Sequence, residues 1–262
     1  MITAVGIGIP FLYIYLVAPP APQPCDGFWW AARLMAVLRK TLLNATYGDN
    51  TAFAYPPVPL DEMTNVDAVI VTHTHPDHRD EAAKSIIAKD TLIFVQDASD
   101  EAELRSAGFT NTQVLTQTTE FQGVSMAKTP GQHGSDHAVA MMPEMLSRVC
   151  GIVFRHPDEK TLYIAGDTLW NEHVRTSIEK YSPQVIAVNC GDARVDGLGS
   201  IIMGKEDVHE VHNAAPQAVL IACHMEAVNH CVLSRNELRE YSTANEMTER
   251  LLVPEDCDSY ML

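Results

Sequence analysis

Basic residues are scarce in this sequence. Lysine and arginine number 18 against 34 aspartates and glutamates, so the formal net charge is -16 over 262 residues. The few basic residues show no obvious cluster. A partner held through a phosphate backbone needs concentrated positive charge. The composition therefore argues against nucleic acid as a partner or substrate and favours a small-molecule substrate.

Cysteines are also few, and they follow no pattern. The six cysteines include no C-x-x-C pair, and several lie in apolar stretches. Disulfide frameworks are typical of short secreted chains, whereas scattered cysteines in a longer chain favour reduced thiols. We therefore expect no disulfide framework and a cytoplasmic location.

The N-terminal stretch complicates that expectation. Residues 2–18 are almost wholly apolar and are followed by Pro19, Pro20, Pro22 and Pro24. This resembles the apolar part of a signal peptide, but no basic residue precedes it, and about 17 residues with an internal proline are marginal for a membrane-spanning helix. Secretion, membrane association through residues 2–18, a buried hydrophobic extension and a poorly ordered N-terminal appendage stay open as alternatives. We treat residues 1–45 as an extension of uncertain structure and residues 46–262 as the main domain.

The rest of the chain alternates short strands with short helices, which indicates an α/β fold. Strands are predicted at 66–71, 91–95, 113–116, 123–127, 150–154, 161–165, 184–188 and 218–222. Helices are predicted at 28–43, 80–88, 99–107, 170–180 and 205–214, with a last one beginning at Ser234. Ser99 and Ser234 are the expected N-caps, and Ser234 with Glu237 forms a capping box.

The most informative segment is the heptapeptide T-H-T-H-P-D-H, residues 72–78, directly after the first of these strands. His73 and His75 alternate at strand spacing, so their rings point the same way. Pro76 stops the strand, and Asp77 and His78 begin a loop. Three imidazoles and a carboxylate this close together are first-choice ligands for zinc and for non-haem iron or manganese. The sequence therefore predicts a metal site here.

Three later strands also end in such residues. His133 follows the strand that ends near Ala127 and stands between glycines, which favours it over His137 as a ligand. Asp167 follows an apolar strand in the sequence I-A-G-D-T, where a helix N-cap is the alternative role. His224 follows another buried strand. The residues after these three strands complete a candidate set of seven ligands, namely His73, His75, Asp77, His78, His133, Asp167 and His224.

The order HxHxDH, then His, then G-D-T, then His resembles the metallo-β-lactamase-fold hydrolases over about residues 60–232. The resemblance implies a four-layer αββα sandwich of two mixed sheets with helices outside, and two divalent metal ions. His73, His75 and His133 would hold one ion; Asp77, His78 and His224 would hold the other, with Asp167 bridging. Family members open with a β-hairpin that has no evident counterpart here, which leaves open whether the N-terminal hairpin is complete.

Within that superfamily, three stretches are most similar to uncharacterised metal-dependent hydrolases related to the L-ascorbate-6-phosphate lactonase group. They are I-A-G-D-T, G-S-I-I-M-G-K-E-D-V and H-M-E-A-V-N-H-C. The resemblance implies that metal-bound hydroxide attacks a small ester, lactone or phosphate-type substrate. Zinc is the favoured metal, with manganese or iron as alternatives. An iron-dependent redox enzyme on the same fold and a non-catalytic family member are the competing functions.

Other polar residues have less certain roles. Asp77 or Asp167 would orient the nucleophile and accept its proton, and His230 is a candidate catalytic acid. Glu226, Asn229 and His230 either face the substrate, support the ligands or cap the next helix. Asp192, Arg194 and Asp196 either contact the substrate or form a plain turn, and His209 and His212 are expected on a solvated helix face.

Overall fold

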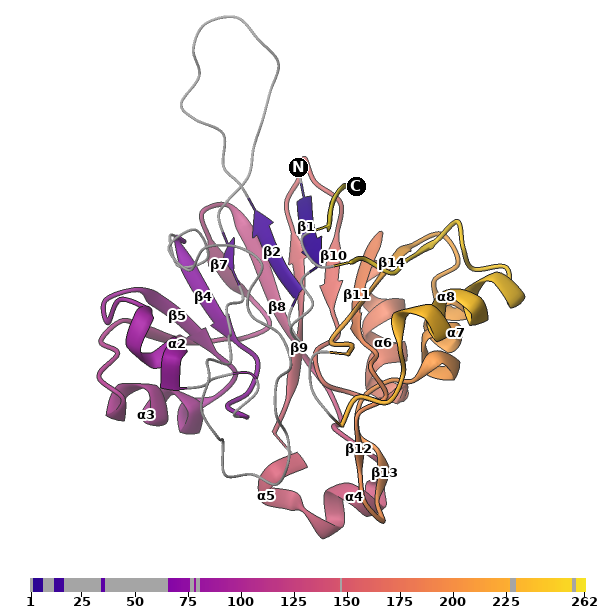
Figure 1. Ribbon diagram of the computed structural model, residues 1–262. Coiled ribbons are helices and arrows are strands. Elements are labelled where there is room, and N and C mark those ends of the chain that lie inside the picture. The colour runs from indigo at the N-terminus through magenta and orange to yellow at the C-terminus, as the bar shows by residue number, and fades with distance from the viewer. Residues whose placement is uncertain are drawn as a thin grey trace, which may run out of the picture.

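A computed structural model of the chain describes residues 2–6, 12–16, 34–35, 66–75, 78, 81–146, 148–226, 230–255 and 258–262. Two layers of β-sheet lie face to face, with helices on both outer sides (Figure 1). Helices α2 (Glu81–Ile86) and α3 (Ala98–Ser106) lie outside one layer of sheet. Helices α6 (Glu172–Tyr181), α7 (Lys205–Ala214) and α8 (Arg235–Ala244) lie outside the other layer. The predicted four-layer αββα sandwich is thereby confirmed.

The larger sheet has seven strands in the order β15-β14-β11-β10-β9-β8-β7. Strands β10, β11, β14 and β15 pair in parallel, whereas β7, β8, β9 and β10 pair in antiparallel fashion, so the sheet is mixed as predicted. The bounds are Thr119–Phe121 for β7, Val124–Pro130 for β8, Cys150–Arg155 for β9, Leu162–Ile164 for β10, Val185–Asn189 for β11, Val219–Cys223 for β14 and Leu251–Leu252 for β15.

The other layer contains four parallel strands in the order β3-β4-β5-β6, namely Leu34–Met35, Ala68–Val71, Leu92–Val95 and Thr112–Val114. A three-stranded antiparallel sheet has the order β16-β1-β2, with β16 at Asp258–Met261, β1 at Ile2–Gly6 and β2 at Leu12–Leu16. Strand β2 contacts β3, so this hairpin continues the layer of the four-stranded sheet.

The N-terminal pairing corrects two expectations. The opening hairpin without evident counterpart in the sequence is present, with Ile2 opposite Leu16 and Gly6 opposite Leu12. The predicted helix over 28–43 is wrong at Leu34 and Met35, which pair with β4, and its other residues lie outside the described ones. At these two residues, pairing with β4 outweighs the local helical pattern. The division at residue 45 stays a prediction.

Five helices follow their predicted positions closely, whereas α4 and α5 were not predicted. The described helices are α2 at Glu81–Ile86, α3 at Ala98–Ser106, α4 at Asp136–Met141, α5 at Pro143–Leu146, α6 at Glu172–Tyr181, α7 at Lys205–Ala214 and α8 at Arg235–Ala244. The capping box of Ser234 and Glu237 is confirmed. Ser99 as the cap of α3 is wrong, because the Asp97 carboxylate accepts from the amides of Ser99 and Asp100 at 2.8 and 3.0 Å. In the described part of the chain, no helix has the length and apolar character needed to cross a membrane.

Strand β11 shows how the core is divided. Val185 and Ala187 pack in the cluster between the two sheets, together with Phe94 of β5. Ile186 and Val188, which alternate with them, pack in the cluster that includes residues of α6, α7 and α8. Successive strand residues point to opposite faces, so a strand buried on both sides is apolar throughout. This explains the unbroken apolar run in the sequence.

The strand directions bring four strand ends to one edge of the sandwich. Strand β8 runs parallel to β10, because both are antiparallel to β9. Strand β14 runs parallel to β10 through β11. The residues that follow β8, β10 and β14 therefore emerge at the same edge, where they meet the segment that follows β4 from the other sheet.

The inter-sheet core yields a stability prediction. Phe94 is fully buried between the sheets, with its ring centroid 5.7 Å from that of Phe121. Replacing Phe94 with alanine should lower the free energy of unfolding by about 3–5 kcal/mol, because the change removes buried area and leaves a cavity. Urea denaturation of the two proteins measures this. The control Met141→Ala, at a side chain that is 63% exposed, should change it by less than about 0.5 kcal/mol.

Candidate metal centre

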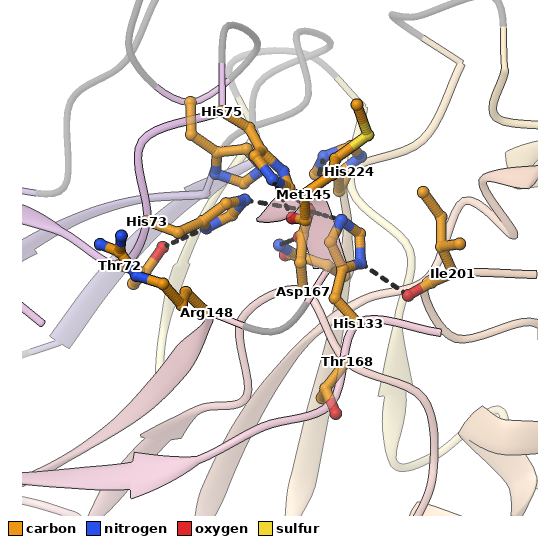
Figure 2. Close-up of polar contacts among 12 residues, drawn as sticks. Thr72, His73, His75, His133, Met145, Arg148, Asp167, Thr168, Ile201 and His224 are labelled. Atoms are coloured by element: carbon orange, nitrogen blue, oxygen red, sulfur yellow. Dashed lines mark hydrogen bonds and ion pairs between the residues drawn. The ribbon is translucent and has the colours of Figure 1, made fainter. Parts of the chain in front are cut away.

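Four histidine rings surround one carboxylate oxygen. Oδ2 of Asp167 lies 3.0 Å from Nε2 of His78, 3.7 Å from Nε2 of His73 and of His133, and 3.8 Å from Nε2 of His224 (Figure 2). All five side chains are buried. They come from the ends of β4, β8, β10 and β14, the strand ends from which the sequence predicted ligands.

Two of the rings are held by backbone carbonyls. Nε2 of His75 donates to the Met145 carbonyl at 2.5 Å, which leaves Nδ1 of that ring with its lone pair. Nδ1 of His133 donates to the Ile201 carbonyl at 2.7 Å, which leaves Nε2 with its lone pair toward Asp167. A metal-binding histidine commonly donates its other ring N–H in this way, which fixes the tautomer and the ring orientation.

His73 supplies the clearest sign that something is held here. Its ring is 1% exposed, and its Nε2 has no hydrogen-bond partner among the described residues. Its Nδ1 lies 3.2 Å from the Thr72 hydroxyl. A buried polar atom without a partner is costly, and a bound cation would satisfy it. The residues present therefore fit a metal ion.

The electrostatics of the cluster favour the ligand forms of these groups. Burial, reinforced by His78 and His75, lowers the pKa of His73 well below its ordinary value. Burial alone would raise the pKa of Asp167, but charge interactions with His78 and His224 and the hydrogen bond from His78 hold that pKa well below the usual range. A neutral imidazole and an ionised carboxylate are the forms that bind metal.

The ligand atoms of the described residues form two overlapping groups. His73, His75 and His133 offer atoms within 4.8 Å of one another, and this set coincides with the first predicted site. The second group contains His78 and Asp167, as predicted, with His73 in addition. His224 belongs to the cluster through its contact with Asp167. Asp77, predicted for the second site, lies outside the described residues.

Asn189 is not among the residues expected from the sequence, and it binds the Asp167 carboxylate through the oxygen that does not face the rings. Its side-chain amide donates to Oδ1 of Asp167 at 2.5 Å, so that Oδ2 is the oxygen turned toward the rings. Oδ1 of Asn189 in turn accepts from the Cys223 thiol at 3.0 Å, across a register pair of β11 and β14. Asn189 is itself the last residue of a buried strand. Extending the strand-end argument to β11 would have found it.

Thr168 is the last residue of the G-D-T sequence. It connects the loop that carries His133 to the loop that carries Asp167. Its hydroxyl accepts from the Gln132 amide at 3.0 Å, and the Leu169 amide donates to the Gln132 carbonyl at 3.0 Å. The loop that carries His133 is thereby tied to the loop that carries Asp167. The N-cap of α6 is Asn171, so the alternative capping role for Asp167 is excluded.

The remaining candidates take structural positions. His137 is exposed on α4, consistent with the preference for His133. Glu226 accepts from the backbone amide of Arg235 at 3.0 Å and from its guanidinium at 2.5 Å, which fits the helix-capping alternative. The backbone carbonyl of His230 accepts from the Arg194 amide at 3.0 Å. The catalytic role of the His230 ring stays a prediction, and Asn229 lies outside the described residues.

Asp192 and Arg194 organise a hairpin. The Asp192 carboxylate accepts from the Ser200 hydroxyl at 2.5 Å and from the Arg194 guanidinium at 2.6 Å. These contacts hold β12, Arg194–Val195, against β13, Gly199–Ser200. Asp196 is exposed in the turn between them. The turn interpretation therefore accounts for Asp192 and Arg194. His209 lies on α7, where its Nδ1 is 3.4 Å from the Tyr241 hydroxyl.

Comparisons with known proteins agree with this geometry. The family model of the β-lactamase superfamily domain matches residues 39–227. The protein YddR of Bacillus subtilis (strain 168), of the UPF0173 group, is 47% identical over 205 residues, which cover 78% of this chain and 80% of that protein.

Two solved structures are similar over nearly the whole chain. One is an isothiocyanate hydrolase from Delia radicum gut bacteria, with 35% identity, a TM-score of 0.88 and 99% coverage of both chains. The other is a possible metal-dependent hydrolase from Veillonella parvula DSM 2008, with 29% identity, a TM-score of 0.88 and full coverage of both chains. With its fold, its cluster of buried histidines around Asp167 and these relatives, the chain belongs to the metallo-β-lactamase-fold family of metal-dependent hydrolases.

Proposed function

We propose that this hydrolase uses two divalent metal ions, zinc before manganese or iron, on a small electrophilic substrate. The observation that carries the proposal is the position of Asp167 Oδ2 among the Nε2 atoms of His73, His78, His133 and His224. One oxygen with imidazoles on several sides suits a carboxylate that bridges two cations. His73, His75 and His133 would hold one ion, and Asp77, His78 and His224 the other.

The ions would supply Lewis acidity and a water molecule with a pKa near neutrality. The protein's own residues keep the donor set in place: the Met145 and Ile201 carbonyls fix the rings of His75 and His133, and Asn189 fixes the carboxylate. Asp77 or Asp167 would accept the proton of the attacking water, and His230 would donate one to the leaving group.

An apolar cluster beside the ligands bears on the substrate. Helices α4 and α5 and the β12–β13 hairpin lie together at one end of the sandwich (Figure 1). Ala138, Leu146 and Ile201 pack in this cluster, with Met145 at its edge. Met145 and Ile201 are also the residues whose carbonyls hold His75 and His133. A substrate that reaches the ligands beside this cluster would gain from an apolar substituent.

Phosphate-type substrates fit this region less well. The guanidinium of Arg148, a residue labelled in Figure 2, is paired with the carboxylates of Asp97 and Asp100 and with the Ser99 hydroxyl. A guanidinium engaged in this way is a poor anion receptor unless those pairs break. Among the substrate classes predicted from the sequence, esters and lactones are therefore favoured over phosphates. The link to the ascorbate-phosphate lactonase group stays a prediction.

Isothiocyanates join this set, because the structural relative from Delia radicum gut bacteria hydrolyses them and is similar over 99% of the chain. Their central carbon is electrophilic, and their substituent can be apolar. The oxygen of water bonds to that carbon, and the bond between the central carbon and nitrogen breaks. Nitrogen takes both protons of the water and leaves as a primary amine, while the central carbon leaves with sulfur and the water oxygen as carbonyl sulfide. Hydrolysis of an isothiocyanate requires a water nucleophile and a proton donor to nitrogen. Ester hydrolysis likewise requires a water nucleophile and a proton donor to the leaving group.

The ligand assignment predicts a sharp loss of function. His75→Ala and Asp167→Ala should each remove metal from one or both sites and reduce hydrolysis by at least about 100-fold, since each removes a ligand. Elemental analysis after gel filtration and turnover assays measure the two effects. His212→Ala, on α7, is the control and should keep both metal and activity. Full activity in either ligand variant would contradict the assignment.

Asn189 can be tested separately from the ligands. Asn189→Ala should weaken metal binding about 10–100-fold, because Asp167 loses the donor that orients it. Competition with a chromophoric chelator measures the affinity. The matched control is Asn236→Ala, whose amide donates to Glu240 on α8. Equal affinities in both variants would show that Asn189 does not position Asp167.

A substrate panel tests the proposed class. The chelator-treated protein should show no turnover, and added zinc or manganese should restore hydrolysis of at least one ester, lactone, thioester or isothiocyanate with an apolar substituent. Phosphodiesters should be poorer substrates. Oxidisable iron with no hydrolytic turnover would favour the redox alternative, and a protein that binds no metal would exclude both.

A further inference from the structure

His224 is held in a backbone conformation that its residue type disfavours. Its φ is +58°, in the left-handed region, directly after the buried strand β14. For a residue with a Cβ this conformation is uncommon and persists only when the surroundings impose it. The contacts around His224 therefore decide where its ring points.

Cys231 lies against the side of that ring away from Asp167. Its Sγ is 3.6 Å from Nδ1 of His224 and 3.6 Å from the His224 carbonyl oxygen, to which the thiol donates. Nε2 of the same ring faces Asp167 Oδ2 at 3.8 Å. If Nε2 is to offer its lone pair to a cation, the ring proton must be on Nδ1, where sulfur accepts it. One thiol thus accepts from the ring and donates to the backbone of the same residue.

The position of Cys231 is set by its neighbours. It forms an isolated antiparallel bridge with Ala193, and the Leu233 amide donates to the Gly191 carbonyl at 3.0 Å. A Cβ on Gly191 would collide with the His224 carbonyl oxygen and come within 2.8 Å of the Cys231 sulfur. Only glycine leaves room for these two groups to meet. Gly191 and Cys231 together close around the turn that carries His224.

We propose that Cys231 is a positioning residue that orients His224 for the second metal ion. The inference rests on the proposed metal-dependent function and adds a sulfur acceptor to it, where His75 and His133 use backbone carbonyls. The thiol is not itself a ligand in this arrangement, because it contacts Nδ1 while Nε2 faces the cluster. Cys231 acts through the ring of His224.

The experiment uses the full chain loaded with Co²⁺, a spectroscopic substitute for zinc. The wild type should bind about two ions. Cys231→Ala should bind one of the two ions about 10–100-fold less tightly while the affinity for the other is unchanged. Cys231→Ser should recover most of the lost affinity, since a hydroxyl also donates and accepts. The matched control Cys190→Ala, at a buried thiol next to Gly191, should resemble the wild type.

Several results would overturn the proposal. Unchanged affinity for both ions in Cys231→Ala would show that the thiol does not position His224. A thiolate-to-cobalt charge-transfer band in the wild type, absent from Cys231→Ala, would show that Cys231 is a ligand instead. If Cys231→Ala does not fold, Cys231→Val, which restores volume without a hydrogen bond, carries the same expectation. A wild-type protein that binds no Co²⁺ would overturn the proposed metal-dependent function as well. Failure of the proposed function is therefore distinguishable from failure of the Cys231 proposal alone, in which the wild type still binds Co²⁺.

Discussion

Asp167 has to keep a negative charge while buried, and the rest of the centre is arranged around that requirement. Burial alone would protonate its carboxyl group, but His78, His224 and His133 lower its pKa. Asn189 satisfies one oxygen, and the other faces the rings. A buried carboxylate with this surrounding is a strong site for cations, because the cost of desolvating the charge has already been met in folding.

The sandwich supplies the rigidity that this arrangement needs. The strands that carry the ligands belong to both sheets, and their inner faces share one apolar cluster that includes Phe94, Met126 and Ile152. The loops beyond the strand ends are tied to one another by Thr168 and by the carbonyls of Met145 and Ile201. Met145 and Ile201, whose carbonyls hold the rings of His75 and His133, also belong to the apolar cluster of α4, α5 and the β12–β13 hairpin, so the proposed substrate region and the ring positions depend on the same residues.

The relatives narrow the chemistry without fixing the substrate. Membership in the metal-dependent hydrolases accounts for the cluster of buried ligands. The isothiocyanate hydrolase from Delia radicum gut bacteria shows that this fold, at 35% identity, serves an electrophilic carbon other than an ester carbonyl. The proposed preference for an uncharged, partly apolar substrate over a phosphate rests on the apolar cluster of α4, α5 and the β12–β13 hairpin and on the paired state of Arg148.

The sequence by itself determined the strands that carry the candidate ligands, the helices α2, α3, α6, α7 and α8, and the order of the candidate ligands. His73, His133, Asp167 and His224 each follow an apolar run, and that local pattern was enough to expect them at one edge of a sheet. Tertiary structure alone decided the rest. Leu34 and Met35 are strand because β4 lies beside them. Asn189 contacts Asp167 from the neighbouring strand β11, and the sulfur of Cys231 lies beside the ring of His224. Such roles depend on which segments meet in space, and local periodicity carries no record of that.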